Sequence, residues 1–198
     1  MQTRAILTGF VLYSFILLLD TLAAKEHDEK DAKSKEQNQR GQVLVSSGGC
    51  NECHSPKIFT PEGTFPDHTR LLSGHPADLK LPEIPTGITG PDKRLGLFIK
   101  DQTAWAGPWG VSFAGNLTPD PKTGIGNWTE DIFIITMRAG RHKGLGRNIL
   151  PPMPWEDYAQ LSDEDLKAIF AYLRTLNPIV NPVPSPIPPT GENIPANP

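Results

Sequence analysis

The clearest pattern of apolar and polar positions lies near the C-terminus and predicts a helix over residues 163–176. Ser162 is a preferred N-cap residue, and Asp165 stands at the third helical position, where it completes the cap. Asn177 and Pro178 end the segment because proline cannot continue a helix. The apolar residues recur at the spacing that places them on one helical face: Leu166, Ile169, Phe170 and Leu173.

A second helix is predicted over residues 130–139, which read EDIFIITMRA. Thr129 can cap its start, and two acidic residues occupy the first turn, where negative charge is favourable. Gly140 follows directly and is the residue type that most readily ends a helix.

The segment before the two cysteines divides into two parts. Residues 25–38 are almost wholly charged or polar, so they cannot bury enough surface to order themselves, and we expect a flexible, solvated spacer. Residues 39–46, QRGQVLVS, carry an apolar run that predicts a short helix ending at Gly48 and Gly49.

Proline and glycine dominate two further stretches. Residues 55–127 show neither helical nor strand periodicity, and a segment of this length without regular structure is typical of a functional or wrapping loop. Trp105 and Trp109 within it, and Trp128 directly after it, are large apolar anchors. Residues 177–198 are rich in proline and are expected to be extended and loosely held.

The first 24 residues have the three-part layout of a secretory signal. Arg4 precedes an apolar run over residues 5–19, and small residues follow up to position 24. Asp20 and Leu22 make the cleavage site imperfect, so residues 1–24 are interpreted as a signal peptide or an uncleaved N-terminal anchor. The chain is expected to be exported, with membrane contact only if this segment is retained.

Composition leaves room for one modest domain, expected over residues 39–176. The formal net charge is −3, so the chain has no basic field suited to nucleic acid. Its two cysteines, Cys50 and Cys53, are followed at once by His54. A disulfide across two residues would close a tiny loop and stabilise little.

Three other chemistries use Cys-x-x-Cys: a dithiol redox switch, half of a zinc site and covalent attachment of a c-type haem. A zinc site needs about four ligands, and neither a second cysteine pair nor paired histidines are present. A dithiol switch belongs beside a βαβ pattern, which is absent, and leaves His54 unexplained. Haem attachment accounts for all three residues, with two thioether bonds to the porphyrin and a histidine nitrogen for the iron.

Met153 is the expected sixth ligand of the iron. It lies between Pro152 and Pro154, and prolines restrict the backbone so that the loop can hold one side chain in place. Met137 lies within the helix over 130–139, where a methionine usually fills core space. His142 and His75 are rival ligands, for which an exposed basic loop and a turn are the simpler accounts.

These segments resemble the small bacterial monohaem cytochromes c with His/Met ligation. The matching stretches are GGCNECH at 48–54, residues 116–144, LPPMPWEDY at 150–158 and residues 161–184. The resemblance implies an all-α fold, with an N-terminal and a C-terminal helix packed beside one covalent haem and long irregular loops. It also implies attachment at Cys50 and Cys53 and axial ligation by His54 and Met153. The insertion at 55–127 departs from the simplest members.

An iron held by two protein ligands has no open position, so the expected function is one-electron transfer. The chain would act as a periplasmic carrier or as the cytochrome subunit of a larger redox complex, and not as an enzyme by itself. Its expected partners are a donor dehydrogenase and an acceptor oxidase or carrier. The alternative is a haem enzyme or gas sensor with a displaceable sixth ligand. An apolar shell for the haem is expected from these residues: Trp105, Trp109, Trp128, Phe170 and Leu173.

Overall fold

The computed structural model describes residues 3–85, 87–93, 96–98 and 101–189. The helices are α1 (Thr3–Ser47), α2 (Cys50–His54), α3 (Glu130–Ala139), α4 (Trp155–Tyr158) and α5 (Asp163–Arg174), with a short 3₁₀ turn η1 (His142–Gly144). The strands are β1 (Lys57–Thr60), β2 (Gly63–Pro66), β3 (Leu97–Phe98), β4 (Ala104–Gly107) and β5 (Gly110–Phe113).

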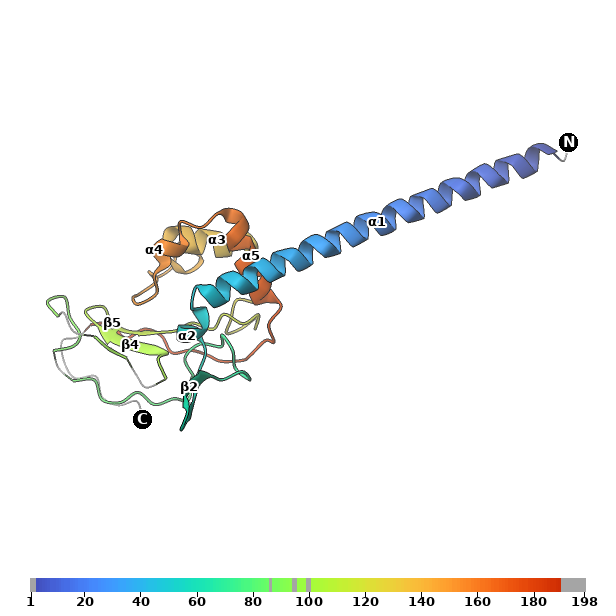
Figure 1. The fold of residues 1–198 in the computed structure, drawn as a ribbon. Coiled ribbons are helices and arrows are strands. Elements are labelled where there is room, and N and C mark those ends of the chain that lie inside the picture. Colours follow the sequence, from blue (N-terminus) through green and yellow to red (C-terminus); the bar gives the residue numbers. More distant parts are fainter. Residues whose placement is uncertain (1–2, 86, 94–95, 99–100, 190–198) are drawn as a thin grey trace.

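Helix α1 projects from the rest of the molecule and joins it only at its C-terminal end, where it packs against α5 (Figure 1). Gly41 makes this close crossing possible, because a Cβ there would lie 1.9 Å from the carbonyl oxygen of Ala168. The Arg40 guanidinium pairs with Asp165 at 2.8 Å beside the crossing. The predicted end of this helix before Gly48 and Gly49 is confirmed.

The expected flexible spacer over residues 25–38 is helical in the structure, as a continuous part of α1. Its residues up to position 36 are exposed, as expected of a solvated segment. The helix is explained by composition, because Lys, Glu, Gln and Ala are good helix formers that need no buried face. Along this helix, His27 Nδ1 lies 3.1 Å from Asp31 Oδ2, four residues further on. Within the described residues, no helix is both long enough and apolar enough to cross a membrane.

The caps predicted for α3 and α5 are confirmed. The Thr129 hydroxyl accepts a hydrogen bond from the backbone N–H of Ile132, and the Ser162 hydroxyl accepts one from that of Asp165. Gly140 ends α3 in the left-handed conformation. These caps satisfy backbone donors that have no partner within the helix.

The main core lies where α1, α3 and α5 meet. The face predicted for α5 is buried as expected, and Leu166 and Leu173 are almost fully enclosed. The side chains of Leu117, Trp128 and Met137 are partly buried against this core. Its buried members are Val45, Leu72, Ile125, Phe133, Leu166, Ile169, Phe170 and Leu173.

The expectation of an all-α fold is wrong in part, because the insertion at 55–127 contains two small antiparallel sheets. Strands β1 and β2 form a hairpin, and β3, β4 and β5 form a three-stranded sheet in that order. Each strand has only two to four residues. Such strands are too short for alternation of apolar and polar residues to stand out in the sequence.

The C-terminal tail is extended as expected, but its described part is not loosely held. Ile187 pairs with Val111 through two backbone hydrogen bonds of 2.8 and 3.0 Å. The Asn181 side chain donates to the carbonyl oxygens of Ser73 and His75. Prolines leave few backbone donors in this tail, so side chains and single bridges fasten it to the insertion. Residues 190–198 lie outside the described part.

Candidate functional site

Helix α2 carries both cysteines and the histidine that follows them. It begins directly after Gly49, whose φ of 70° turns the chain sharply away from α1. Cys50 and Cys53 are three residues apart, so their thiols lie on one side of the helix. Both are free and half-buried, and burial raises the pKa of each thiol.

The imidazole ring of His54 makes a hydrogen bond that determines which ring nitrogen is free. Its Nδ1 lies 2.8 Å from the carbonyl oxygen of Gly115, an acceptor, so Nδ1 must carry the proton. Burial lowers the pKa of His54, which favours the neutral ring. The lone pair of Nε2 is therefore the one available to a metal, in the arrangement usual for metal-binding histidines.

Tyr158 connects α4 with the start of α2. Its hydroxyl donates to the carbonyl oxygen of Gly48 at 2.7 Å and contacts Cys50 Sγ at 3.8 Å. Helix α4 begins two residues after Met153, so Tyr158 links the segment that follows the methionine loop to the start of α2. Sequence reasoning missed Tyr158, since contacts more than a hundred residues apart leave no local pattern.

The loop that carries Met153 is fastened from two directions. Its own backbone forms a turn, with the N–H of Met153 donating to the carbonyl oxygen of Leu150 at 3.3 Å. The Ser112 hydroxyl of β5 donates to the carbonyl oxygen of Pro151 at 2.6 Å and accepts from Trp109 Nε1 at 3.1 Å. The Met153 side chain is half-buried.

The three rival ligands lie in different surroundings. Met137 is partly buried against the main core. His142 lies in an exposed loop, and its ring meets the edge of Trp128 with centroids 5.3 Å apart. His75 is fully buried in the insertion, and its Nδ1 bonds to Thr103 Oγ1 at 2.8 Å.

The apolar shell expected from five residues is divided in the structure. Trp128, Phe170 and Leu173 belong to the main core, against which Cys50 also packs. Trp105 and Trp109 lie instead on the β4–β5 hairpin, where Trp109 supports the loop before Met153. The separation has a simple cause: the hairpin belongs to the insertion, which has a small core of its own.

The donor set of α2 fits a c-type haem. Two free thiols three residues apart are followed by a histidine whose Nε2 is available, and apolar side chains pack beside Cys50. Cys50 and Cys53 would hold the group through thioether bonds, and His54 would bind its iron. In the described part of the chain, no group of three or more His, Cys, Asp and Glu side chains forms another metal site.

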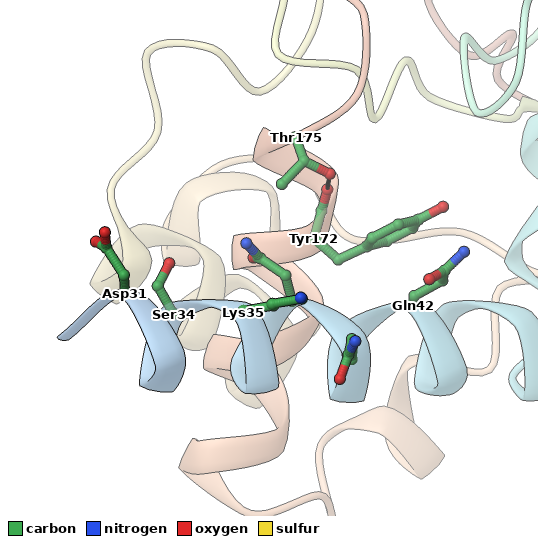
Figure 2. A pocket seen from close by; sticks show the side chains of 8 residues that line it. Asp31, Ser34, Lys35, Gln42, Tyr172 and Thr175 are labelled. Carbon is green, nitrogen blue, oxygen red and sulfur yellow. Dashed lines mark hydrogen bonds between the residues drawn. The ribbon is translucent and has the colours of Figure 1, made fainter. Parts of the chain in front are cut away.

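A shallow surface pocket lies elsewhere, between α1 and α5. Figure 2 shows its polar lining, with Asp31, Ser34, Lys35 and Gln42 on α1, Tyr172 on α5 and Thr175 directly after α5. It contains none of the cysteine, histidine or methionine residues discussed above, so it has no part in the candidate site.

The link through Tyr158 leads to a stability prediction. Tyr158→Phe removes a hydroxyl that bonds to Gly48 and contacts Cys50, so we expect the free energy of unfolding to fall by about 0.5–1.5 kcal/mol. Chemical denaturation followed by circular dichroism measures this change. Tyr172→Phe, in the pocket between α1 and α5, is the matched control. Equal effects of the two variants would contradict the role given to Tyr158.

The chain is similar to cytochrome and dehydrogenase subunits over parts of its length. It is 32% identical over 159 residues to the gluconate 2-dehydrogenase cytochrome c subunit of Pantoea cypripedii, covering 79% of this chain and 26% of that one. It is 38% identical over 87 residues to the cytochrome c subunit of the quinone alcohol dehydrogenase of Gluconobacter oxydans, covering 44% and 17%. It is 36% identical over 78 residues to a subunit of the nicotinate dehydrogenase of Pseudomonas putida, covering 39% and 6%.

No protein-family model matches the chain. The chain spans about a quarter or less of the length of these relatives. Two of the three are named cytochrome c subunits, and the helix α2 has the donor set that such proteins require. The names of these relatives therefore support a bacterial c-type cytochrome.

Proposed function

We propose that this chain transfers single electrons as the cytochrome subunit of a dehydrogenase complex, or as a carrier that serves one. The named relatives belong to dehydrogenases that act on gluconate, on alcohols and on nicotinate. The donor is then a dehydrogenase subunit, and the acceptor is a terminal oxidase or another carrier. The chain itself performs no substrate chemistry.

The proposed site consists of Cys50, Cys53, His54 and Met153 with one haem c. When bound, the haem supplies a reversible one-electron change at its iron. The two thiols hold it covalently, and His54 offers Nε2 because Gly115 accepts the proton on Nδ1. Met153 completes the ligand set from a loop fastened through Ser112. A thioether ligand stabilises the reduced iron more than a second histidine would.

The proposed setting is the bacterial periplasm, because c-type attachment takes place outside the cytoplasm. Residues 1–24 serve as an export signal or anchor, and residues 25–38 separate that segment from the cytochrome domain at 39–176. The helical form of 25–38 supports a stiff spacer, since a helix extends by about 1.5 Å per residue. Residues 177–198 follow as a proline-rich tail that, up to residue 189, is bonded to the insertion.

The observation that carries the proposal is the hydrogen bond between His54 Nδ1 and Gly115. It leaves the neutral ring with one free nitrogen directly after two free thiols. The test is expression in a bacterium able to attach haem c, followed by haem staining after denaturing electrophoresis and a pyridine haemochrome spectrum. We expect one covalent haem per chain and a reversible one-electron titration.

The same preparation distinguishes an electron carrier from a haem enzyme or gas sensor. A fixed Met153 resists replacement, so we expect the reduced protein not to bind CO and the oxidised protein to bind cyanide poorly. Rapid binding of either ligand would contradict the electron-transfer assignment. An absence of covalent haem would contradict the whole proposal.

A further inference from the structure

The ammonium group of Lys57 is a buried charge that the proposed function does not use. Lys57 begins β1, three residues after His54, and its residue is only 9% exposed. Its Nζ donates three hydrogen bonds to backbone carbonyl oxygens: Asn51 at 3.2 Å, Glu52 at 2.8 Å and Ser55 at 2.7 Å. These carbonyls lie in and just after α2, and that of Asn51 also accepts the backbone N–H of Ser55 at 3.3 Å.

The three hydrogen bonds require the charged form of the side chain. An ammonium group has three N–H donors, and each has an acceptor here, whereas a neutral amine has only two. Burial lowers the pKa of Lys57, while the nearby charges of Glu52, Cys53 and Asp101 raise it. A charged group this far from water is retained only when such partners replace its lost hydration.

The charge of Lys57 acts on the residues that would hold the haem. Its Nζ is hydrogen-bonded to two carbonyl oxygens within α2, those of Asn51 and Glu52, and to that of Ser55 directly after His54. A positive field is therefore present at the attachment segment itself. Because the group is buried, salt screens this field much less than it screens a surface charge.

We propose that Lys57 sets the reduction potential of this cytochrome by holding a fixed positive charge against the haem-attachment helix. The oxidised iron carries one more positive charge than the reduced iron, so a nearby cation disfavours the oxidised state and raises the potential. The three hydrogen bonds keep the charge in place and hold the end of α2. This inference rests on the proposed function, because it requires a haem on Cys50 and Cys53.

Two nearby carboxylates counteract the positive charge of Lys57, Glu52 from an exposed position and Asp101 from a buried one. Glu52 is on the exposed side of α2, where water and salt weaken its effect. Asp101 is buried in the insertion, and its Oδ2 accepts from Thr103 at 2.6 Å. Replacing Asp101 by asparagine removes this opposing charge without touching the hydrogen bonds of Lys57.

The test is a spectroscopic redox titration of the haem-loaded protein and its variants. We expect the reduction potential to fall in both Lys57→Met and Lys57→Gln. At a fixed applied potential, the ratio of reduced to oxidised protein should change about tenfold toward the oxidised form, which corresponds to about 59 mV for one electron. Their haem spectra should stay unchanged, since no ligand is altered. Lys33→Met removes the same charge from an exposed position on α1, about 21 Å along the helix from Ser47, and should have no effect.

Each outcome bears on one claim. If Lys57→Gln carries haem and keeps the wild-type potential, the inference is overturned and the proposed function stays intact. If the wild-type chain carries no haem, the proposed function is overturned. If neither Lys57 variant folds, Asp101→Asn decides: a shift toward the reduced form supports the inference, and an unchanged potential overturns it. Equal shifts in Lys33→Met and Lys57→Met would also overturn it, because a remote charge would then act as strongly.

Discussion

Replacing Cys50 or Cys53 by serine removes most of the haem-loaded protein, which is the largest effect that we expect. Each change removes one thioether bond, and Cys50 also packs against the main core. The helical core is small for the length of the chain, and folding is therefore expected to depend on the haem. Because binding of such a group contributes directly to folding, we expect the yield to fall about tenfold or more.

The measurement combines haem staining with far-ultraviolet circular dichroism of the purified protein. Ser47→Ala, at the exposed end of α1, is the control for a small change in the same region. A normal yield with a native helical signal and no haem would show that the protein folds unaided, contrary to this prediction.

Met153→Ala is expected to change the spectrum and the potential together. Loss of the thioether opens the sixth position, so the oxidised protein should lose its methionine–iron charge-transfer band and the reduced protein should bind CO. The potential should fall, because methionine favours the reduced iron. We expect a shift of at least about tenfold in the ratio of reduced to oxidised protein at a fixed potential, or about 59 mV. Absorption spectra during a redox titration measure both changes.

Two further substitutions make this result specific. Met137→Ala should keep the band and mainly lower the free energy of unfolding, by about 2 kcal/mol. This is the low end of the range for replacing a core methionine by alanine, because the Met137 side chain is only partly buried. His142→Ala should change neither, because its ring is in an exposed loop beside Trp128. The ligand assignment would be wrong if Met137→Ala abolished the band and Met153→Ala preserved it.

The helices that pack around the core could be predicted from local sequence, because their signals are local. Ser162 and Thr129 cap helices through hydrogen bonds to residues three positions away, and apolar residues of α5 recur at helical spacing. The attachment residues could be recognised for the same reason, since Cys50, Cys53 and His54 lie within five consecutive positions. The site roles themselves stay predictions.

The insertion was predictable only as a loop. Its strands are short and are stabilised by backbone pairing with neighbouring strands. Val111 of β5 also pairs with Ile187 of the distant tail. The expectation of helices joined by irregular loops was therefore correct only in part, because it left out the short strands within residues 55–127. The form of residues 25–38 was missed for a different reason: their polarity predicted exposure correctly, but good helix formers can extend a helix without burying anything.

By itself, the sequence determined where the helices around the core begin and end and which segment could attach a haem, because both depend on residues that are near neighbours in the chain. Only the tertiary structure decided what surrounds that segment. The carbonyl oxygen of Gly115 holds the proton on Nδ1 of His54, Ser112 fastens the methionine loop, and the side chain of Lys57 is buried. The first two depend on contacts between residues far apart in the chain. The enclosure of Lys57 depends on how the surrounding chain packs, which no local pattern records.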